Sequence, residues 1–261
     1  MTTAVVTGAA SGMGRACVES LRGLANVLVA VDLNVPDIEG TVGVACDVSD
    51  PAAVDALAAR VRELGPFRAL AHAAGISPTM DDARRVFEVD LVGTQLMLDA
   101  FEELAVPGSA AVCFSSSAAY QFAPIVDADH EALISDPLAP DFLDRAASAV
   151  SDSGFAYGLA KVGVIRAVGR ASVRWGLRGA RVNSVAPGLI DTPMGRQEFE
   201  QQPVMKDLLA RTPLGRLGEP SEVAAVVAYL VSDAASFVSG IDVLVDGGMM
   251  QGTATAGAGG S

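Results

Sequence analysis

The stretch AVVTGAASGMG, residues 4–14, determines the fold class that we expect for this 261-residue chain. Its apolar start predicts a buried strand, and a helical pattern of apolar residues begins at Gly14. Between them, Gly8, Gly12 and Gly14 follow a G-x-x-x-G-x-G spacing. Glycines at a strand-to-helix turn let a pyrophosphate approach the backbone N–H groups of the helix N-terminus. The spacing suggests a dinucleotide site but is weak evidence alone, because an ordinary glycine-rich turn looks the same.

Short apolar runs and helical segments alternate along the rest of the chain. Further strands are expected at 27–31, 42–45, 69–73, 110–114, 181–185 and 243–245. Helices are expected at 14–24, 51–64, 83–104, 157–175 and 221–230. Buried strands that alternate with helices indicate a parallel sheet covered on both faces. We predict a single domain over residues 1–251 with an α/β fold, a Rossmann-type doubly wound parallel sheet. Residues 252–261 hold only Gly, Ala, Thr and Ser and are expected to be disordered.

Composition excludes several classes of protein. The formal net charge of -13 would repel a nucleic-acid backbone and an anionic membrane. The N-terminus lacks a signal-peptide pattern, and no apolar run is long enough to span a bilayer. Cys17, Cys46 and Cys113 are scattered without metal-ligand spacing, which fits reduced thiols. We therefore expect a cytoplasmic protein without a metal site that binds neither nucleic acid nor membrane.

Asp32 makes the dinucleotide site more specific. It ends the second expected strand, twenty residues after Gly12, where a carboxylate accepts both ribose hydroxyls of an adenosine. A carboxylate there repels a 2′-phosphate, and no Arg or Lys stands at residues 9–11 to bind one. The sequence thus favours NAD(H) over NADP(H). Asp47 is placed to reach the adenine edge, although an Asp that only caps its own loop fits equally well. The small residues 73–75 allow close approach of the adenosine.

Tyr157 and Lys161 are the candidate catalytic pair. They lie four residues apart, on one face of the expected helix 157–175. A free phenol titrates near 10, so we expect the Lys161 ammonium to lower the pKa of Tyr157. Ser116, just after the fifth strand, is placed to hydrogen-bond a substrate oxygen. These groups suit hydride transfer to or from a carbonyl, with Tyr157 as acid/base. The alternative is a surface Tyr–Lys contact of no catalytic importance.

These motifs together resemble the short-chain dehydrogenase/reductase family. The resemblance runs over residues 2–250 and includes, in order, residues 7–14, Asp32, Asp47-Val48, Ala74-Gly75, Ser116, Tyr157/Lys161, Asn183, Pro187-Gly188, Arg216-x-Gly-x-Pro220 and Val245-Asp246-Gly247-Gly248. It implies the catalytic residues Ser116, Tyr157 and Lys161, and a homodimer or homotetramer formed through helices 83–104 and 157–175. The cofactor-binding residues that it implies are Gly8, Ser11, Gly12, Met13, Gly14, Asp32, Leu33, Cys46, Asp47, Val48, Ala73, Ala74, Gly75, Tyr157, Lys161, Pro187, Gly188, Ile190 and Thr192.

Two positions depart from the family pattern. Asp90 stands where the family has an Asn whose backbone carbonyl holds a water in a proton relay from the lysine. Asp90 supplies the same backbone carbonyl as the Asn. We therefore count Asp90 among the catalytic residues and expect an active enzyme with an altered pH dependence. His72 stands at the first position of the family's Asn-Asn-Ala-Gly motif. We interpret His72 as a hydrogen-bonded structural group and not a catalyst.

Two segments are expected to shape the substrate site. Forty residues separate Ser116 from Tyr157, where about a dozen is usual for the family; the excess, about 121–155, is acidic and otherwise irregular, with a short helix starting near Pro140. A similar insertion occurs in the bacterial 3α-hydroxysteroid dehydrogenase/carbonyl reductase branch. We expect it to roof one side of the cleft and to favour a dimer, although a surface insertion without function is the alternative. Residues 189–209, with Met194, Phe199 and Met205, are expected to form a substrate lid.

The function expected from the sequence is an NAD(H)-dependent oxidoreductase. It would interconvert a secondary alcohol, either a hydroxysteroid or another bulky cyclic alcohol, and its ketone by hydride transfer. Met and Phe side chains in the lid suggest an apolar small molecule as its partner, although they fit plain packing equally well. The alternatives are a catalytically weak NAD-binding regulatory protein, owing to Asp90, and an epimerase or dehydratase.

Overall fold

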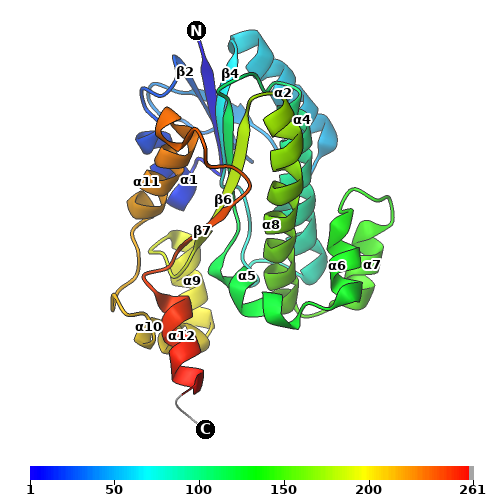
Figure 1. Ribbon diagram of the computed structural model, residues 1–261, viewed down its shortest axis with the longest axis vertical. Coiled ribbons are helices and arrows are strands. Elements are labelled where there is room, and N and C mark those ends of the chain that lie inside the picture. Colours follow the sequence, from blue (N-terminus) through cyan, green and yellow to red (C-terminus); the bar gives the residue numbers. More distant parts are fainter. Residues whose placement is uncertain (259–261) are drawn as a thin grey trace.

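The computed structural model describes residues 1–258 and consists of one parallel sheet with helices on both faces (Figure 1). The order of the strands in the sheet is β3-β2-β1-β4-β5-β6-β7, and all neighbouring strands are parallel. The strands are β1 (Thr3–Thr7), β2 (Val27–Asp32), β3 (Val42–Ala45), β4 (Phe67–His72), β5 (Ala110–Phe114), β6 (Arg181–Pro187) and β7 (Asp242–Val245). This is the doubly wound Rossmann-type arrangement predicted from the sequence.

The helices fall into two layers and a group below the sheet. One face carries α1 (Gly12–Ser20) and α11 (Pro220–Val231); the other carries α2 (Pro51–Leu64), α4 (Gly93–Glu102) and α8 (Ser153–Leu177) (Figure 1). The other helical segments are α3 (Ala83–Val86), the π-helical η1 (Phe87–Val92), α5 (Ser117–Phe122), the 3-10 turn η2 (Ala123–Ile125), α6 (Ala128–Ser135), α7 (Phe142–Ala149), α9 (Pro193–Gln201), α10 (Val204–Ala210), the 3-10 turn η3 (Asp233–Ala235) and α12 (Met249–Ala258). Apolar side chains fill a core on each face of the sheet.

The strand order reverses between β1 and β4, and this reversal positions the site. Chain connections leave β1 and β4 in opposite directions, so a crevice opens at their carboxyl ends. The turn after β1 is packed so tightly against β4 that glycine is required. A Cβ on Gly8, whose φ is 66°, would lie 2.9 Å from the backbone of Ala73 and Ala74. A Cβ on Gly14 would overlap the Gly8 carbonyl, because helix α1 starts directly above the turn.

The predicted helix 83–104 is not one regular α-helix. It begins as α3, passes through the π-helical η1 and ends as α4. Asp90 lies in η1, and its side chain is fully buried. A π-helical stretch rotates side chains away from the regular α-helical positions and is frequent at functional sites.

The insertion differs from our expectation of an irregular segment that roofs the cleft. It contains η2, α6 and α7, and the two helices lie outside α8 and α3 (Figure 1). Phe142 of α7 packs edge-on against Phe87 of η1, with ring centroids 5.9 Å apart. Leu133 and Ile134 of α6 are buried in the same core. The insertion therefore covers the segment that carries Asp90, because Leu133, Ile134 and Phe142 are buried in that core, whereas only residues at its two ends line the cleft.

The prediction of a disordered tail at 252–261 is wrong for its first part. Residues up to 258 continue α12, and residues 259–261 lie outside the described part of the chain. Gly252 sits against the carbonyl of Arg211, where a Cβ would not fit, so the small residues of the tail allow close packing. No helix within residues 1–258 combines the length and the apolar character needed to cross a membrane.

Candidate active site

Two adjoining cavities open at the carboxyl edge of the sheet. The glycine-loop cavity has a volume of about 270 Å³ and lies between the turn after β1 and the ends of β2, β3 and β4. It brings together most of the predicted cofactor residues: Gly8, Ser11, Gly12, Met13, Gly14, Asp32, Leu33, Cys46, Asp47, Val48, Ala73, Ala74, Gly75 and Thr192. Backbone N–H groups at the start of α1 and the tight glycine turn make it fit a dinucleotide pyrophosphate.

Asp32 is held over the glycine turn by two backbone hydrogen bonds. Its Oδ2 accepts from the Ala10 N–H at 2.9 Å, and its Oδ1 accepts from the Leu33 N–H at 2.8 Å. The carboxylate is partly exposed and lines the glycine-loop cavity. Each oxygen keeps a free lone pair, so the group can still accept from two ribose hydroxyls.

Asp47 caps its own loop and also lines the glycine-loop cavity. Its Oδ1 accepts from the Ser49 N–H at 2.9 Å and from the Ser49 hydroxyl at 2.6 Å. Its Oδ2 accepts from Arg85 at 3.2 Å, and Arg85 also contacts Glu88 at 2.8 Å. The contacts are thus those of the loop-capping alternative. Arg85, which also lines the cavity and was not predicted, is neutralised by two carboxylates and is poorly suited to bind a 2′-phosphate.

The lid cavity has a volume of about 350 Å³ and lies next to the glycine-loop cavity, with which it shares Met13, Thr192 and Met194. Ser116 and Tyr157 line it, as do the predicted cofactor residues Pro187, Gly188 and Ile190. The predicted lid, now α9 and α10, supplies one wall: Leu189, Met194, Gly195, Glu198, Phe199, Gln202, Val204, Met205 and Leu208. From the insertion, only Gln121, Phe122 and Gly154 reach the cavity.

Ser116 and Tyr157 come from neighbouring helices that meet at this cavity. Ser116 is the N-cap of α5, and its Oγ accepts from the Ala118 N–H at 3.2 Å. Tyr157 lies in the first turns of α8, which packs against α5. Gly158 makes this packing possible, because a Cβ there would overlap the Phe122 ring.

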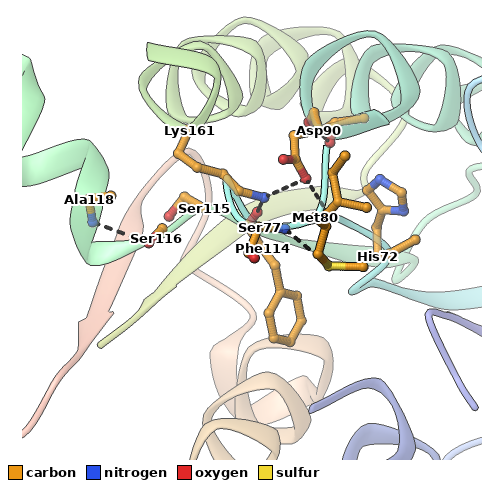
Figure 2. A network of polar contacts seen from close by, with 12 residues as sticks. His72, Ser77, Met80, Asp90, Phe114, Ser115, Ser116, Ala118 and Lys161 are labelled. Atoms are coloured by element: carbon orange, nitrogen blue, oxygen red, sulfur yellow. Dashed lines mark hydrogen bonds and ion pairs between the residues drawn. The ribbon is translucent and has the colours of Figure 1, made fainter. Parts of the chain in front are cut away.

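Lys161 lines neither cavity but lies buried just behind Tyr157. Its ammonium donates to Asp90 Oδ1 at 3.1 Å and to the Phe114 carbonyl at 3.2 Å (Figure 2). It lies 5.4 Å from the centre of the Tyr157 ring. The side chain of Lys161 is 6% exposed and that of Asp90 0% exposed. Sequence analysis missed this ion pair, because it assigned a role only to the backbone carbonyl of Asp90; that carbonyl accepts from the Thr94 hydroxyl at 2.7 Å.

The structure does not show the lowered pKa that we expected for Tyr157. Burial raises the pKa of the Tyr157 phenol, and the charges of Asp90 and Glu198 raise it further, while Ser116 lowers it. Burial also raises the pKa of Asp90, but Lys161 and the Ile76 N–H, at 3.1 Å, oppose this. The negative charge of Asp90 next to Lys161 offsets the effect that an unpaired ammonium would have on the phenol.

His72 is a structural group, as we interpreted it. It ends β4, is fully buried, and its Nδ1 lies 2.8 Å from the Thr7 hydroxyl. The Thr7 hydroxyl oxygen also accepts from the Ala74 N–H at 3.1 Å. Burial lowers the pKa of His72 to about 3, so the imidazole is neutral near pH 7.

Glu198 is a second charged cavity residue, after Arg85, that was not predicted from the sequence. It projects from α9 into the lid cavity, and burial raises its pKa to about 7. Helical periodicity identifies α9, but it does not tell which face of a short helix points to the cavity.

The comparisons with known proteins agree with this geometry. A family model described as "Enoyl-(Acyl carrier protein) reductase" matches residues 8–130 and 143–250, and the break falls within the insertion. The cis-4-hydroxycyclohexanecarboxylate dehydrogenase of Sinomonas cyclohexanicum is 36% identical over 94% of this chain and 95% of its own length. The D-threitol dehydrogenase of Mycolicibacterium smegmatis is 30% identical over 94% and 91%.

Solved structures show the same relationship. The 3-alpha-hydroxysteroid dehydrogenase from Pseudomonas sp. B-0831, complexed with NADH, superposes with a TM-score of 0.79 and 31% sequence identity. The similarity covers 95% of this chain and 96% of that one. Together with the parallel sheet, the glycine turn and the Ser116, Tyr157 and Lys161 cluster, these matches show that the chain belongs to the short-chain dehydrogenase/reductase family of oxidoreductases.

Proposed function

We propose that this protein is an NAD(H)-dependent oxidoreductase that interconverts a secondary alcohol, a hydroxysteroid or another bulky cyclic alcohol, and its ketone. One observation carries the proposal: Tyr157 and Ser116 line a cavity that directly adjoins the glycine-loop cavity. An acid/base, a hydroxyl that can polarise a carbonyl, and a dinucleotide-sized crevice are the groups that carbonyl reduction requires. The relatives named as alcohol dehydrogenases support the same chemistry.

The residues that would hold the cofactor are those of the glycine-loop cavity, with Tyr157, Lys161, Pro187, Gly188 and Ile190 around the nicotinamide end. The glycine turn admits the pyrophosphate, and Asp32 would accept the adenosine ribose hydroxyls and disfavour NADP. The NADH bound to the similar Pseudomonas enzyme supports this choice. When bound, the nicotinamide supplies or takes up the hydride.

Tyr157 would exchange the proton with the substrate oxygen. In reduction its phenol donates to the carbonyl oxygen while Ser116 donates a hydrogen bond to the same atom. Burial and the two carboxylates keep the phenol protonated at neutral pH in this structure. The protonated phenol is the form that donates in reduction, and the phenolate is the form that accepts in oxidation. Lys161 and Asp90 act from behind Tyr157 as a neutral pair.

The substrate class follows from the lid cavity. Its lining is largely apolar and includes Met194, Phe199, Met205 and Phe122. A volume of about 350 Å³ lies in the range of cavities that enclose small organic ligands. The names of two relatives, a 3-alpha-hydroxysteroid dehydrogenase and a cis-4-hydroxycyclohexanecarboxylate dehydrogenase, support a cyclic alcohol.

We also propose that residues 1–251 form one catalytic domain and that the protein is a homodimer or homotetramer in the cytoplasm. The three cysteines are buried free thiols, which suits a reducing compartment.

A panel assay tests the function. The purified protein would be incubated with NAD or NADP and cyclic secondary alcohols that include hydroxysteroids, and with NADH or NADPH and the matching ketones. With NAD or NADH we expect the absorbance of the reduced nicotinamide to change as the reaction proceeds. In Tyr157→Phe the reaction rate should fall by about 10²–10⁴-fold. NADH binding without turnover of any compound would contradict the proposal and favour the regulatory alternative.

A further inference from the structure

The lid cavity contains one carboxyl group in otherwise neutral and mostly apolar surroundings. Its lining comes from α5, α8, α9, α10 and the segment after β6, and within residues 1–258 Glu198 is the one acidic or basic side chain among the lining residues. Glu198 shares the inner face of α9 with Met194, Gly195 and Gln202, at the spacing of helix turns. Glu200, two residues on, is exposed and does not line the cavity.

No basic side chain of the described chain pairs with Glu198. The ion pairs found within residues 1–258 do not include it. Lys161 is near enough to lower the pKa of Glu198, but its ammonium is engaged by Asp90 at 3.1 Å and by the Phe114 carbonyl. Ser77 also lowers the pKa, whereas Asp90 raises it.

Burial without a cation is unfavourable for a carboxylate, and this structure shows the consequence. Desolvation is the largest influence on Glu198 and raises its pKa to about 7. A ligand that brought a positive charge and an N–H donor into the cavity would remove that penalty, because a charge-assisted hydrogen bond replaces the lost hydration. A ligand with a carboxylate would increase it by repulsion between like charges.

We propose that Glu198 is a specificity residue that binds a protonated amine on the substrate, so that the enzyme prefers cyclic ketones or alcohols that carry a basic nitrogen. The inference rests on the proposed function, because it concerns the same cavity. Glu198 and Tyr157 line the same cavity of about 350 Å³, so one small ligand can reach both. We therefore expect the nitrogen and the reacting carbon to belong to one small ring system.

A substrate with a basic nitrogen would differ in charge from the substrate of one relative. The Sinomonas enzyme is named for cis-4-hydroxycyclohexanecarboxylate, an anionic substrate. In the present cavity a carboxylate on the ring would share a largely apolar space with Glu198. We infer that an anionic cyclohexane substrate is rejected here, despite 36% identity between the two chains.

The test uses three ketones with one ring and different substituents. These are 4-(dimethylamino)cyclohexanone, its neutral isostere 4-isopropylcyclohexanone, and 4-oxocyclohexanecarboxylate. The specificity constant kcat/KM for each is measured with NADH at about pH 8, where Glu198 is ionised and the amine is protonated. Binding of each ketone to the NAD complex, which cannot reduce it, is measured by calorimetry as a second readout. Glu198→Gln removes the charge, and Glu200→Gln is the matched control on the same helix.

We expect the wild-type protein and Glu200→Gln to prefer the amine over its isostere by tenfold or more, in kcat/KM and in affinity. The carboxylate should be the poorest substrate of the three. In Glu198→Gln the ratio of amine to isostere should fall to near one. Equal use of amine and isostere by the wild type, or a preference that survives in Glu198→Gln, would overturn the inference while leaving the proposed function intact. If the protein reduces none of these ketones and no other cyclic ketone, the proposed function is wrong. Calorimetry then still measures whether Glu198 contributes to the affinity for the amine.

Discussion

The carboxylate of Asp90 and the ammonium of Lys161 form an ion pair 3.1 Å long in the interior of the protein. Asp90 comes from the π-helical η1 and Lys161 from α8, so the pair joins two helical segments behind Tyr157. Asp90 Oδ1 also accepts from the Ile76 N–H, whereas Asp90 Oδ2 is buried and has no hydrogen-bond partner within residues 1–258. Lys161 also donates to the Phe114 carbonyl (Figure 2). Its electrostatic consequence is that the positive charge next to the catalytic phenol is balanced by a negative one.

Asp90→Asn should shift the pH dependence of alcohol oxidation. The charge of Asp90 raises the pKa of Tyr157, so its removal lowers that pKa. Oxidation requires the deprotonated phenol, and the rising limb of the kcat–pH profile should therefore move to lower pH. We expect a several-fold gain in oxidation rate near neutrality. The profile is measured with NAD and the best alcohol of the panel.

The exposed Asp55 of α2 provides the matched control for this shift. Asp55→Asn removes one negative charge from the surface and should leave the profile of the wild type in place. A profile for Asp90→Asn that coincides with that of the wild type would show that the Asp90 charge does not act on Tyr157.

His72 should make the protein less stable in mild acid. Its pKa is about 3 in the folded protein and near 6.5 in the unfolded chain, so the unfolded chain binds more protons between these values. The free energy of unfolding should therefore fall as pH decreases through this window, by up to about 1.4 kcal/mol per pH unit from this group. Urea unfolding at a series of pH values measures the slope.

His72→Asn should lack this component, whereas His130→Asn, which alters the partly exposed histidine of α6, should keep it. Other carboxylates also contribute to acid unfolding, so the decisive quantity is the difference between variant and wild type. An equal slope for His72→Asn and the wild type would show that His72 is not the group responsible.

Ser116→Ala should affect both activity and stability. Loss of a hydroxyl that donates to the substrate oxygen should reduce kcat/KM by roughly 10²-fold. The same oxygen caps α5 through the Ala118 N–H, so the free energy of unfolding should fall by about 1 kcal/mol. Ser116→Thr keeps a hydroxyl at this position and should restore the stability. If the kcat/KM of Ser116→Ala equals that of the wild type, Ser116 is not a catalytic residue.

Asp32→Ala should reduce the preference for NAD over NADP. The Asp32 carboxylate accepts hydrogen bonds from the Ala10 and Leu33 N–H groups at the cofactor cavity. There it would accept hydrogen bonds from the ribose hydroxyls and repel a 2′-phosphate. Loss of charged hydrogen bonds worth about 1.5–3 kcal/mol corresponds to a 10- to 100-fold weaker binding of NADH. Fluorescence titration with NADH and NADPH measures both affinities. The exposed Asp37→Ala is the control, and an unchanged ratio in Asp32→Ala would refute this role.

The insertion should favour a dimer in solution. Helices α6 and α7 lie outside α8 and the α3–η1 segment, as the buried Phe142 and the Arg166–Glu131 pair at 2.7 Å show. They occupy part of the surface through which the family is expected to associate. Light scattering coupled to size exclusion should give the mass of two chains. A tetramer joined through α4 and α8 would contradict this prediction.

Local patterns in the sequence determined most of the scaffold. Apolar runs predicted the seven strands within one or two residues at each end, and Asp50 followed by Pro51 placed the start of α2. These features depend on neighbouring residues, so they can be read along the chain. The glycine turn was predictable for the same reason, since only its short spacing matters. The tail was the exception to this local predictability. In α12, Gly252 packs against the carbonyl of Arg211, which is distant in the sequence.

The tertiary structure alone decided which charges meet. Asp90 and Lys161 lie 71 residues apart, and the packing of the π-helical η1 against α8 brings them together. Glu198 faces the cavity because α9 folds over it, and no periodic signal in a nine-residue helix indicates that. The sequence thus determined the family and the sheet, and it identified the candidate catalytic side chains. Their protonation and the character of the substrate cavity depend on distances through space and on burial, which a linear pattern does not contain.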